Sequence, residues 1–226
     1  MNTGEGFPIA EEFTSLQGEG AYVGTPMYFI RLAGCNVGKP ARALKTGPFP
    51  ILQNGDEAKA CTSWDGRIFP CDTDYSTRYH KTPDQLTQNA LGSGLVHACI
   101  TGGEPVIHKR IQDLIEMLNE AGIQPHVETS GTIYHPLPYA WVACSPKLMA
   151  LNTMVQRADE LKLLVDDDFD PAKLTHSMYH HKNVFLCPIN GVTELNARNV
   201  ERCKELVLKN PTWRVSFQAH KFYNWR

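Results

Sequence analysis

Three cysteines fall within a stretch of 37 residues, at Cys35, Cys61 and Cys71. Thiolates bind both iron–sulfur clusters and zinc, so the number of ligands helps to distinguish the two. A [4Fe–4S] cluster held by three thiolates keeps one iron free to bind another molecule, whereas a closed structural zinc site needs a fourth protein ligand. The three thiols therefore favour a cluster with an open iron.

From about residue 83, strand-like apolar runs alternate with helix-like segments. Such alternation is typical of βαβ units around a parallel sheet, and right-handed crossovers curl that sheet in the sense of a barrel. We therefore predict an α/β fold, a partial (βα) barrel of about six parallel strands, in a single domain over residues 1–226. Expected strands lie at residues 27–32, 95–100, 124–128, 139–144, 160–165, 183–187 and 213–217, and expected helices at 83–91, 107–118 and 192–208.

Short polar or flexible segments follow three of the expected strands. Ligands bind at the carboxyl ends of the strands in barrel-like folds. Gly102 and Gly103 allow the backbone to approach a ligand closely, and Glu104 can accept a hydrogen bond from an ammonium group. The hydroxyl-rich segments at 128–132 and 145–147 could do similar work, or simply form helix caps and turns.

Arg31 interrupts the apolar run at residues 27–32. An unpaired buried charge is very costly, so this guanidinium needs a partner. A structural ion pair would satisfy it, and so would a bidentate contact with a substrate carboxylate. We favour the carboxylate clamp because the strand brings Arg31 beside Cys35.

Several segments occur in an order that resembles one enzyme family. Residues 71–73 read Cys-Asp-Thr, residues 102–105 read Gly-Gly-Glu-Pro, and residues 15–20 read Ser-Leu-Gln-Gly-Glu-Gly. Ser-Pro-Lys at 145–147 and Gln-Ala-His-Lys at 218–221 follow. Over residues 11–221 the chain resembles the 7-carboxy-7-deazaguanine synthase branch of the radical S-adenosylmethionine (SAM) family.

The resemblance implies a radical reaction on a small molecule. The cluster would bind SAM, and an electron from a flavodoxin-like donor would cleave it to a 5′-deoxyadenosyl radical. The radical would take hydrogen from 6-carboxy-5,6,7,8-tetrahydropterin, which would lose ammonia and become 7-carboxy-7-deazaguanine, a precursor of queuosine and other 7-deazapurines. The branch also implies Mg²⁺ and a homodimer. In this type of enzyme the cofactor carries the difficult chemistry, while the protein orients the substrate.

The resemblance also implies roles for individual residues. Cys35, Cys61 and Cys71 would hold the cluster, and Thr73 would bind Mg²⁺. The expected SAM-binding residues are Pro70, Asp72, Gly103, Glu104, Ser130, Ser145, Pro146 and Lys147. The expected substrate-binding residues are Leu16, Gln17, Gly18, Glu19, Arg31, Thr101 and His220.

The cysteine spacing departs strongly from the family pattern. Most radical SAM enzymes have C-x3-C-x2-C, whereas this chain has C-x25-C-x9-C, with an insertion at about residues 38–60. Lengthening the first spacer from three to 25 residues costs roughly 2 kcal/mol in closure entropy, which metal–thiolate bonds can offset. Cys61 is the expected second ligand, and Cys144 is its main rival. Pro70 and Cys187 replace residues that are usually aromatic and polar, respectively.

The composition argues against several other classes of protein. With 22 Lys and Arg against 24 Asp and Glu, the chain lacks the positive excess expected of a nucleic-acid-binding protein. No apolar run approaches a membrane span, and the start of the sequence lacks a signal-peptide pattern. Seven cysteines do not suggest a disulfide framework, so we expect a reducing cytoplasm. Cys99, Cys144, Cys187 and Cys203 are expected to be small buried hydrophobes.

Two alternative functions remain open from the sequence. One is a radical SAM activase that makes a glycyl radical on a partner protein, although residues 15–20 and 218–221 argue against it. The other is a non-enzymatic zinc-binding module, in which a histidine such as His80 completes the ligand set. The two classes differ in their metal, because the enzymes need iron and sulfide whereas the module needs only zinc.

Overall fold

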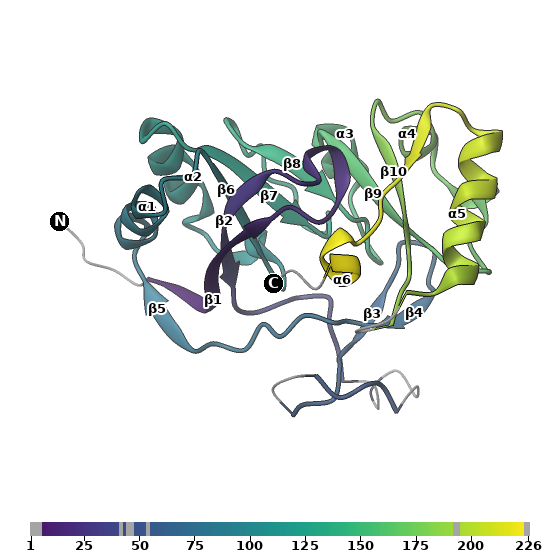
Figure 1. The fold of residues 1–226 in the computed structure, drawn as a ribbon, viewed down its shortest axis with the longest axis horizontal. Coiled ribbons are helices and arrows are strands. Elements are labelled where there is room, and N and C mark those ends of the chain that lie inside the picture. Colours follow the sequence, from purple (N-terminus) through teal and green to yellow (C-terminus); the bar gives the residue numbers. More distant parts are fainter. Residues whose placement is uncertain (1–5, 41–42, 44–47, 53–54, 192–194, 224–226) are drawn as a thin grey trace.

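A nine-stranded sheet forms the centre of the computed structural model, which describes residues 6–40, 43, 48–52, 55–191 and 195–223 (Figure 1). Its strands are ordered β11-β10-β9-β8-β7-β6-β2-β1-β5. Each neighbouring pair from β2 to β11 is parallel, while β1 is antiparallel to both β2 and β5. The strands are β1 (Phe7–Leu16), β2 (Pro26–Leu32), β5 (Tyr79–Lys81), β6 (His97–Gly102), β7 (Gln124–Thr129), β8 (Trp141–Cys144), β9 (Glu160–Val165), β10 (Val184–Pro188) and β11 (Trp213–Val215).

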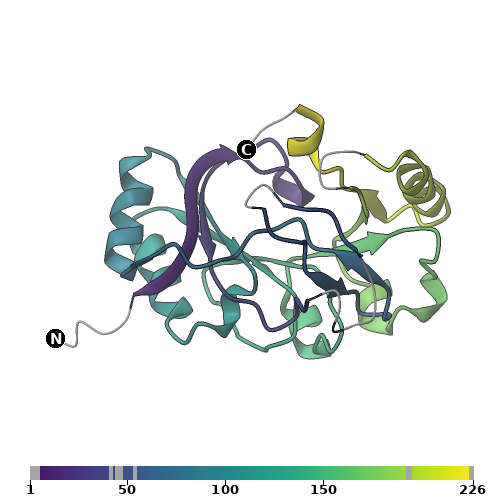
Figure 2. The same ribbon diagram turned by 90° about the horizontal axis from the view of Figure 1, so that it is seen from below.

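Helices surround the outer side of the curved sheet (Figure 2). They are α1 (Pro83–Gly92), α2 (Ile111–Glu120), α3 (Asn152–Arg157), α4 (His176–Tyr179) and α5 (Ala197–Lys209), while the short α6 (Ala219–Tyr223) lies beside the loop that follows β1. Single 3-10 turns occur at Gly20–Tyr22, Pro105–Ile107 and Pro171–Lys173. In the described part of the chain, no helix has the length and apolar character needed to cross a membrane.

The two faces of the sheet have different chemistry because side chains alternate along each strand. The outward residues Ile100, Val127 and Leu161 are fully buried and pack with the apolar side chains of α2 in the largest core cluster. The inward positions include Thr101, Glu128 and Lys162, which face a cavity. The fold therefore places its apolar core beneath the helices and reserves the concave side for polar groups.

The structure confirms the predicted α/β fold with a mostly parallel sheet. Seven strands are parallel in the described residues, rather than about six, and the sheet ends at β11 and β5 without closing into a barrel. The sequence reasoning missed β1 and β5, which extend the sheet by antiparallel pairing. The register of β1 against β2 shifts between Ile9 and Glu11, so the regular alternation of the two faces is interrupted at that point of the strand.

Two of the predicted helices begin later than expected. The segment predicted as a helix from 107 starts at Ile111, since Pro105–Ile107 forms a separate 3-10 turn. The segment predicted from 192 starts at Ala197, where the side chain of Asn196 accepts hydrogen bonds from the first free backbone N–H groups. Residues 192–194, and 41–42, 44–47 and 53–54 of the expected insertion, lie outside the described residues.

The apolar face of α2 provides a direct test of this packing. Leu114 is fully buried against the sheet, so Leu114→Ala should lower the free energy of unfolding by about 2–5 kcal/mol. Leu208→Ala is the matched control, because Leu208 is 75% exposed on α5 and its replacement should change stability by less than about 0.5 kcal/mol. Urea unfolding followed by circular dichroism measures both, and equal effects would contradict the described core.

Candidate active site

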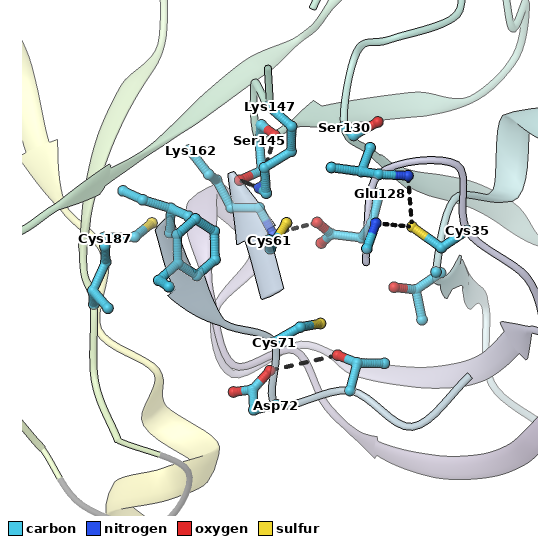
Figure 3. Close-up of a pocket in the computed structure, with 18 of the residues that line it drawn as sticks. Cys35, Cys61, Cys71, Asp72, Glu128, Ser130, Ser145, Lys147, Lys162 and Cys187 are labelled. Carbon is cyan, nitrogen blue, oxygen red and sulfur yellow. Dashed lines mark hydrogen bonds and ion pairs between the residues drawn. The ribbon is translucent and has the colours of Figure 1, made fainter. Parts of the chain in front are cut away.

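A cavity of about 250 Å³ opens at the carboxyl ends of the parallel strands (Figure 3). The thiols of Cys35, Cys61 and Cys71 line it together. Other lining residues come from the ends of β6, β7, β9 and β10, including Thr101, Glu128, Leu164 and Cys187. Residues that are far apart in sequence thus meet where a parallel sheet normally binds its ligand.

A β-hairpin brings Cys61 close to Cys71. Strand β3 (Ala60–Thr62) pairs with β4 (Ile68–Pro70), and Cys61 lies opposite Phe69 in the register. The backbone N–H of Cys71 then donates to the carbonyl of Lys59 at 2.8 Å, which extends the pairing by one residue. The nine-residue spacer therefore folds back on itself, and the unusual cysteine spacing is compatible with a compact thiol site.

The hairpin is fixed to the rest of the molecule by one arginine. Arg67 donates to Asp65 at 2.7 Å, to Asp166 at 2.5 Å and to the carbonyl of Leu164 at 2.8 Å. Burial raises the pKa of Asp65, but hydrogen bonds from Arg67 and Ser63 outweigh it and the pKa is lowered overall. Asp166 thus anchors the hairpin to the end of β9.

A second contact ties the same hairpin to the segment after β8. Ser63 forms an isolated antiparallel bridge with Lys147, and the backbone N–H of Leu148 donates to the carbonyl of Thr62 at 3.0 Å. The Nζ atom of Lys147 donates to Ser145 Oγ at 2.6 Å. The predicted Ser-Pro-Lys segment therefore adjoins the residues that carry Cys61.

Cys35 follows β2 in a turn that depends on glycine. The backbone N–H groups of Val37 and Gly38 both donate to Cys35 Sγ at 3.4 Å. At Gly103 a Cβ atom would lie 2.1 Å from the carbonyl oxygen of Gly34 and 2.6 Å from the Cβ of Cys35. No side chain fits in that space, so a glycine at 103 allows the end of β6 to approach the first thiol.

The environment of the three thiols fits a metal cluster. Burial, and then the charges of Asp72 and Cys61, raise the pKa of Cys71 to about 11, and burial also raises the pKa of Cys61, so these thiols stay protonated until a metal binds and deprotonates them. The hydroxyl of Tyr75 is buried and has no hydrogen-bond partner among the described residues, and burial and the three thiols raise its pKa. An unpaired buried hydroxyl beside three thiols can donate to the sulfur of a bound cluster.

The zinc alternative lacks the histidine that the sequence suggested for it. Thiolates on one tetrahedral zinc lie about 3.8 Å apart, given a Zn–S distance of about 2.3 Å. Within the described ranges, no group of three or more Cys, His, Asp and Glu residues is close enough to hold one ion. His80, proposed as a fourth ligand for a zinc module, is exposed on the edge strand β5 and does not line the cavity.

Glu104 is fully buried beneath the cavity and does not line it. Its carboxylate accepts hydrogen bonds from Thr129 Oγ1 at 2.9 Å, from the Ser130 N–H at 2.6 Å, and from the Ser130 hydroxyl. The Val106 N–H donates to it at 3.1 Å. Glu104 therefore holds the segment after β7 in place, and Ser130, another predicted SAM-binding residue, faces the cavity.

A buried lysine joins two glutamates on the concave face of the sheet. Lys162 Nζ forms ion pairs with Glu19 at 3.0 Å and with Glu128 (Figure 3), and all three residues line the cavity. Burial lowers the pKa of Lys162, but the charges of Glu128, Glu19 and Glu160 raise it well above its ordinary value. These charges therefore favour the cationic form of Lys162 in this site.

Residues near the carboxyl end of the sequence close one side of the cavity. The Ala219 N–H donates to the carbonyl of Gly18 at 3.0 Å, and Gln218 Nε2 donates to Glu19 at 3.0 Å. Lys221 Nζ donates to Asp72 at 2.6 Å, directly between Cys71 and Thr73 in the sequence. The side chain of His220 lies outside the described residues.

The cavity brings together most of the residues expected from the sequence. Those that line it are Cys35, Cys61, Cys71, Pro70, Asp72, Thr73, Gly103, Ser130, Ser145, Lys147, Glu19 and Thr101. Gly18 and Pro146 are next in sequence to lining residues without lining the cavity themselves, and Leu16, the last residue of β1, does not line it either. Gln17 also lies behind the lining, where its amide donates to Glu128 at 3.3 Å.

Arg31 lies on the concave face opposite Thr101 in the strand pairing, but it does not line the cavity. Its Nε donates to Glu11 on β1 at 2.8 Å. The described arrangement therefore shows the structural ion pair that the sequence left open as the alternative. A carboxylate clamp by Arg31 stays a prediction, because such a role would require the guanidinium to turn from Glu11 toward the cavity.

Sequence reasoning missed Lys162, Tyr75 and Lys221 as lining residues. Lys162 could have been found from the sequence, because after Glu160 it is the one charged residue in the apolar strand β9. The other two lie in segments of irregular pattern, and only the folded chain shows them beside the thiols. Cys144, the rival second ligand, is fully buried in the core beneath Gly131 and does not line the cavity.

A curved, mostly parallel sheet with three thiols in a cavity at its carboxyl ends is the arrangement of a radical SAM enzyme. No protein-family model matches the chain. Curated proteins named 7-carboxy-7-deazaguanine synthase are 32% identical to it in Synechocystis sp., over 96% of this chain and 92% of the relative, and 32% identical in Bacteroides thetaiotaomicron, over 96% and 98%. The crystal structure of QueE from Escherichia coli is similar, with a TM-score of 0.65 and 28% identity over 95% of both chains. The chain belongs to the 7-carboxy-7-deazaguanine synthase family.

The hydrogen bonds of Glu104 lead to a prediction about stability. In Glu104→Gln the amide can accept at one oxygen only, so a buried donor of Thr129 or Ser130 loses its partner. We expect the free energy of unfolding to fall by about 1–3 kcal/mol, as measured by urea unfolding. The exposed Glu116→Gln is the control and should be nearly neutral. An unchanged stability in Glu104→Gln would show that these hydrogen bonds contribute little.

Glu160 leads to a prediction about pH. Burial raises its pKa from the ordinary 4.5 to about 7, against the opposing charge of Lys162. The folded protein thus binds a proton that the unfolded chain releases above pH 4.5, so this residue makes stability fall as pH rises through that interval. Glu160→Gln should gain stability relative to wild type between about pH 4.5 and 7, by at most about 3 kcal/mol. Urea unfolding across this range measures the difference, and a constant difference would contradict the raised pKa.

Proposed function

We propose that the chain converts 6-carboxy-5,6,7,8-tetrahydropterin to 7-carboxy-7-deazaguanine with loss of ammonia, as a radical SAM enzyme. The observation that carries this proposal is the convergence of Cys35, Cys61 and Cys71 in one cavity at the carboxyl ends of the sheet. The relatives that share nearly the whole chain are named for the same activity. A queuosine or 7-deazapurine pathway is the setting in which this product is used.

The cavity residues fit the cofactors of this family. Cys35, Cys61 and Cys71 would hold a [4Fe–4S] cluster, and Tyr75 would donate a hydrogen bond to it. When bound, the cluster and SAM supply the radical that starts the reaction. Gly103, Ser130, Ser145 and Lys147 line the part of the cavity proposed for SAM, together with Pro70 and Asp72. Thr73, also in the lining, is the proposed ligand of Mg²⁺.

The remaining polar groups of the cavity would position the pterin. Glu19 and Thr101 line it directly, while Gln17 supports Glu128 from behind. The segment at residues 216–221 closes the side of the cavity beside Glu19, and so limits access of water to the reacting atoms. His220 and Arg31 complete the proposed set of substrate contacts.

Further properties follow from the same proposal. We propose that one domain carries the whole activity, because a single sheet supplies both the thiols and the polar wall of the cavity. A flavodoxin-like protein is the proposed electron donor, and a homodimer is the proposed assembly. An oxygen-sensitive cluster and seven free cysteines suit a reducing cytoplasm.

Anaerobic reconstitution with iron and sulfide tests the proposal. Wild type should take up about four irons per chain and convert the pterin in a SAM-dependent reaction that Mg²⁺ stimulates. Cys61→Ala should hold no stable cluster, since it lacks one of three thiol ligands. Cys144→Ala, the matched control, removes a buried thiol outside the cavity and should keep its iron.

The outcomes separate the parts of the proposal. Iron uptake without conversion of this pterin would leave the cluster site intact and overturn the substrate. Binding of zinc alone would overturn the radical chemistry. Loss of iron in Cys144→Ala with retention in Cys61→Ala would exchange the roles of these two cysteines.

A further inference from the structure

Lys162 is largely buried and forms ion pairs with two carboxylates that line the cavity. Its side chain is 6% exposed, yet its Nζ reaches Glu19 from the loop after β1 and Glu128 from the end of β7. Both carboxylates are 20% exposed and line the cavity. The lysine is thus largely buried between two acceptors that face the place where a ligand would bind.

Each carboxylate is held at both oxygen atoms. Glu19 pairs with Lys162 through Oε2 and accepts from the amide of Gln218 through Oε1 at 3.0 Å. Glu128 pairs with Lys162 through Oε2 and accepts from the amide of Gln17 through Oε1 at 3.3 Å. A carboxylate oxygen has two lone pairs and each of these contacts uses one, so a contact that fixes the orientation of the group still allows the same oxygen to accept from a ligand.

The charge of the group indicates which ligand it suits. One ammonium faces two carboxylates, and Glu160 lies close enough to raise the pKa of the lysine as well. The excess of acceptors favours a ligand edge made of N–H donors and disfavours a carboxylate. The 2-amino-4-oxopyrimidine ring has such an edge, with an amino group beside a ring N–H, and it is present in both the pterin and the deazaguanine.

We infer that Lys162 is a positioning residue, which fixes Glu19 and Glu128 as acceptors for the amino edge of the pyrimidine ring. The inference rests on the proposed function, because it takes the pterin as the substrate. Without the ammonium, nothing offsets the repulsion between the two carboxylates, so they separate. Their acceptor atoms then leave the positions that match the donors of the ligand edge.

Ligand discrimination tests this role. The probes are 7-carboxy-7-deazaguanine and its 2-deamino analogue, measured as inhibitors of the reconstituted enzyme. Wild type should bind the amino compound at least about tenfold more tightly. Lys162→Met and Lys162→Gln should reduce this ratio to about threefold or less and raise the KM for the pterin about tenfold, with iron content unchanged. A general disturbance of the fold would weaken both ligands equally and leave the ratio unaltered.

Two variants keep the test decisive. Lys162→Gln retains a donor for either carboxylate, so it serves if Lys162→Met does not fold. Lys204→Met is the control, because this lysine is 61% exposed on α5 and its replacement should change neither the ratio nor KM.

The result that overturns the inference is a folded Lys162→Gln enzyme with the wild-type ratio. A wild-type enzyme that holds iron but neither converts the pterin nor binds either probe overturns the proposed function, and the inference with it. Conversion by wild type with equal affinity for the two probes overturns the inference alone.

Discussion

The antiparallel pairing of residues 60–62 with 68–70 is the interaction on which the thiol site depends. It fixes Cys61 relative to Cys71, although nine residues separate them, and it gives the site a rigid support in place of a short loop. Arg67 then joins this hairpin to the end of β9 through two hydrogen bonds, to Asp166 and to the carbonyl of Leu164. The long spacer before Cys61 is tolerated because the second and third thiols are already ordered by secondary structure.

Polar groups on the concave face form the other half of the site. A buried charge is costly unless it is paired, and Lys162 meets this requirement with two carboxylates. Glu160 lies in the same region and accepts from the Ala21 N–H at 2.8 Å, with a raised pKa. Well-packed apolar residues often replace a buried ion-pair network without loss of stability. We therefore attribute the presence of this network to the orientation of the ligand.

The parallel strands and their loops could be predicted because apolar runs of strand length are a strong local signal. Residues 102–105 and 145–147 were predicted to lie at the carboxyl ends of these strands, and the structure places the cavity at the same ends. The β3–β4 hairpin could not be predicted, since its strands are only three residues long and its order depends on Arg67 and on the segment around Lys147. The burial of Glu104 and the ion pair of Arg31 with Glu11 likewise depend on contacts between distant segments.

The contacts of residues 216–221 have a consequence for how the protein is made. Ser216 Oγ accepts from the Gly20 N–H at 2.8 Å, across 196 positions of sequence, and Lys221 reaches Asp72 across 149. Contacts between residues so far apart in the sequence form slowly in folding. On the ribosome they cannot form before the later partner has been synthesised. The three thiols are translated early, whereas the wall that shields them arrives late. Iron and sulfide are therefore best delivered to a completed chain, and a nascent chain would expose its thiols to oxidants.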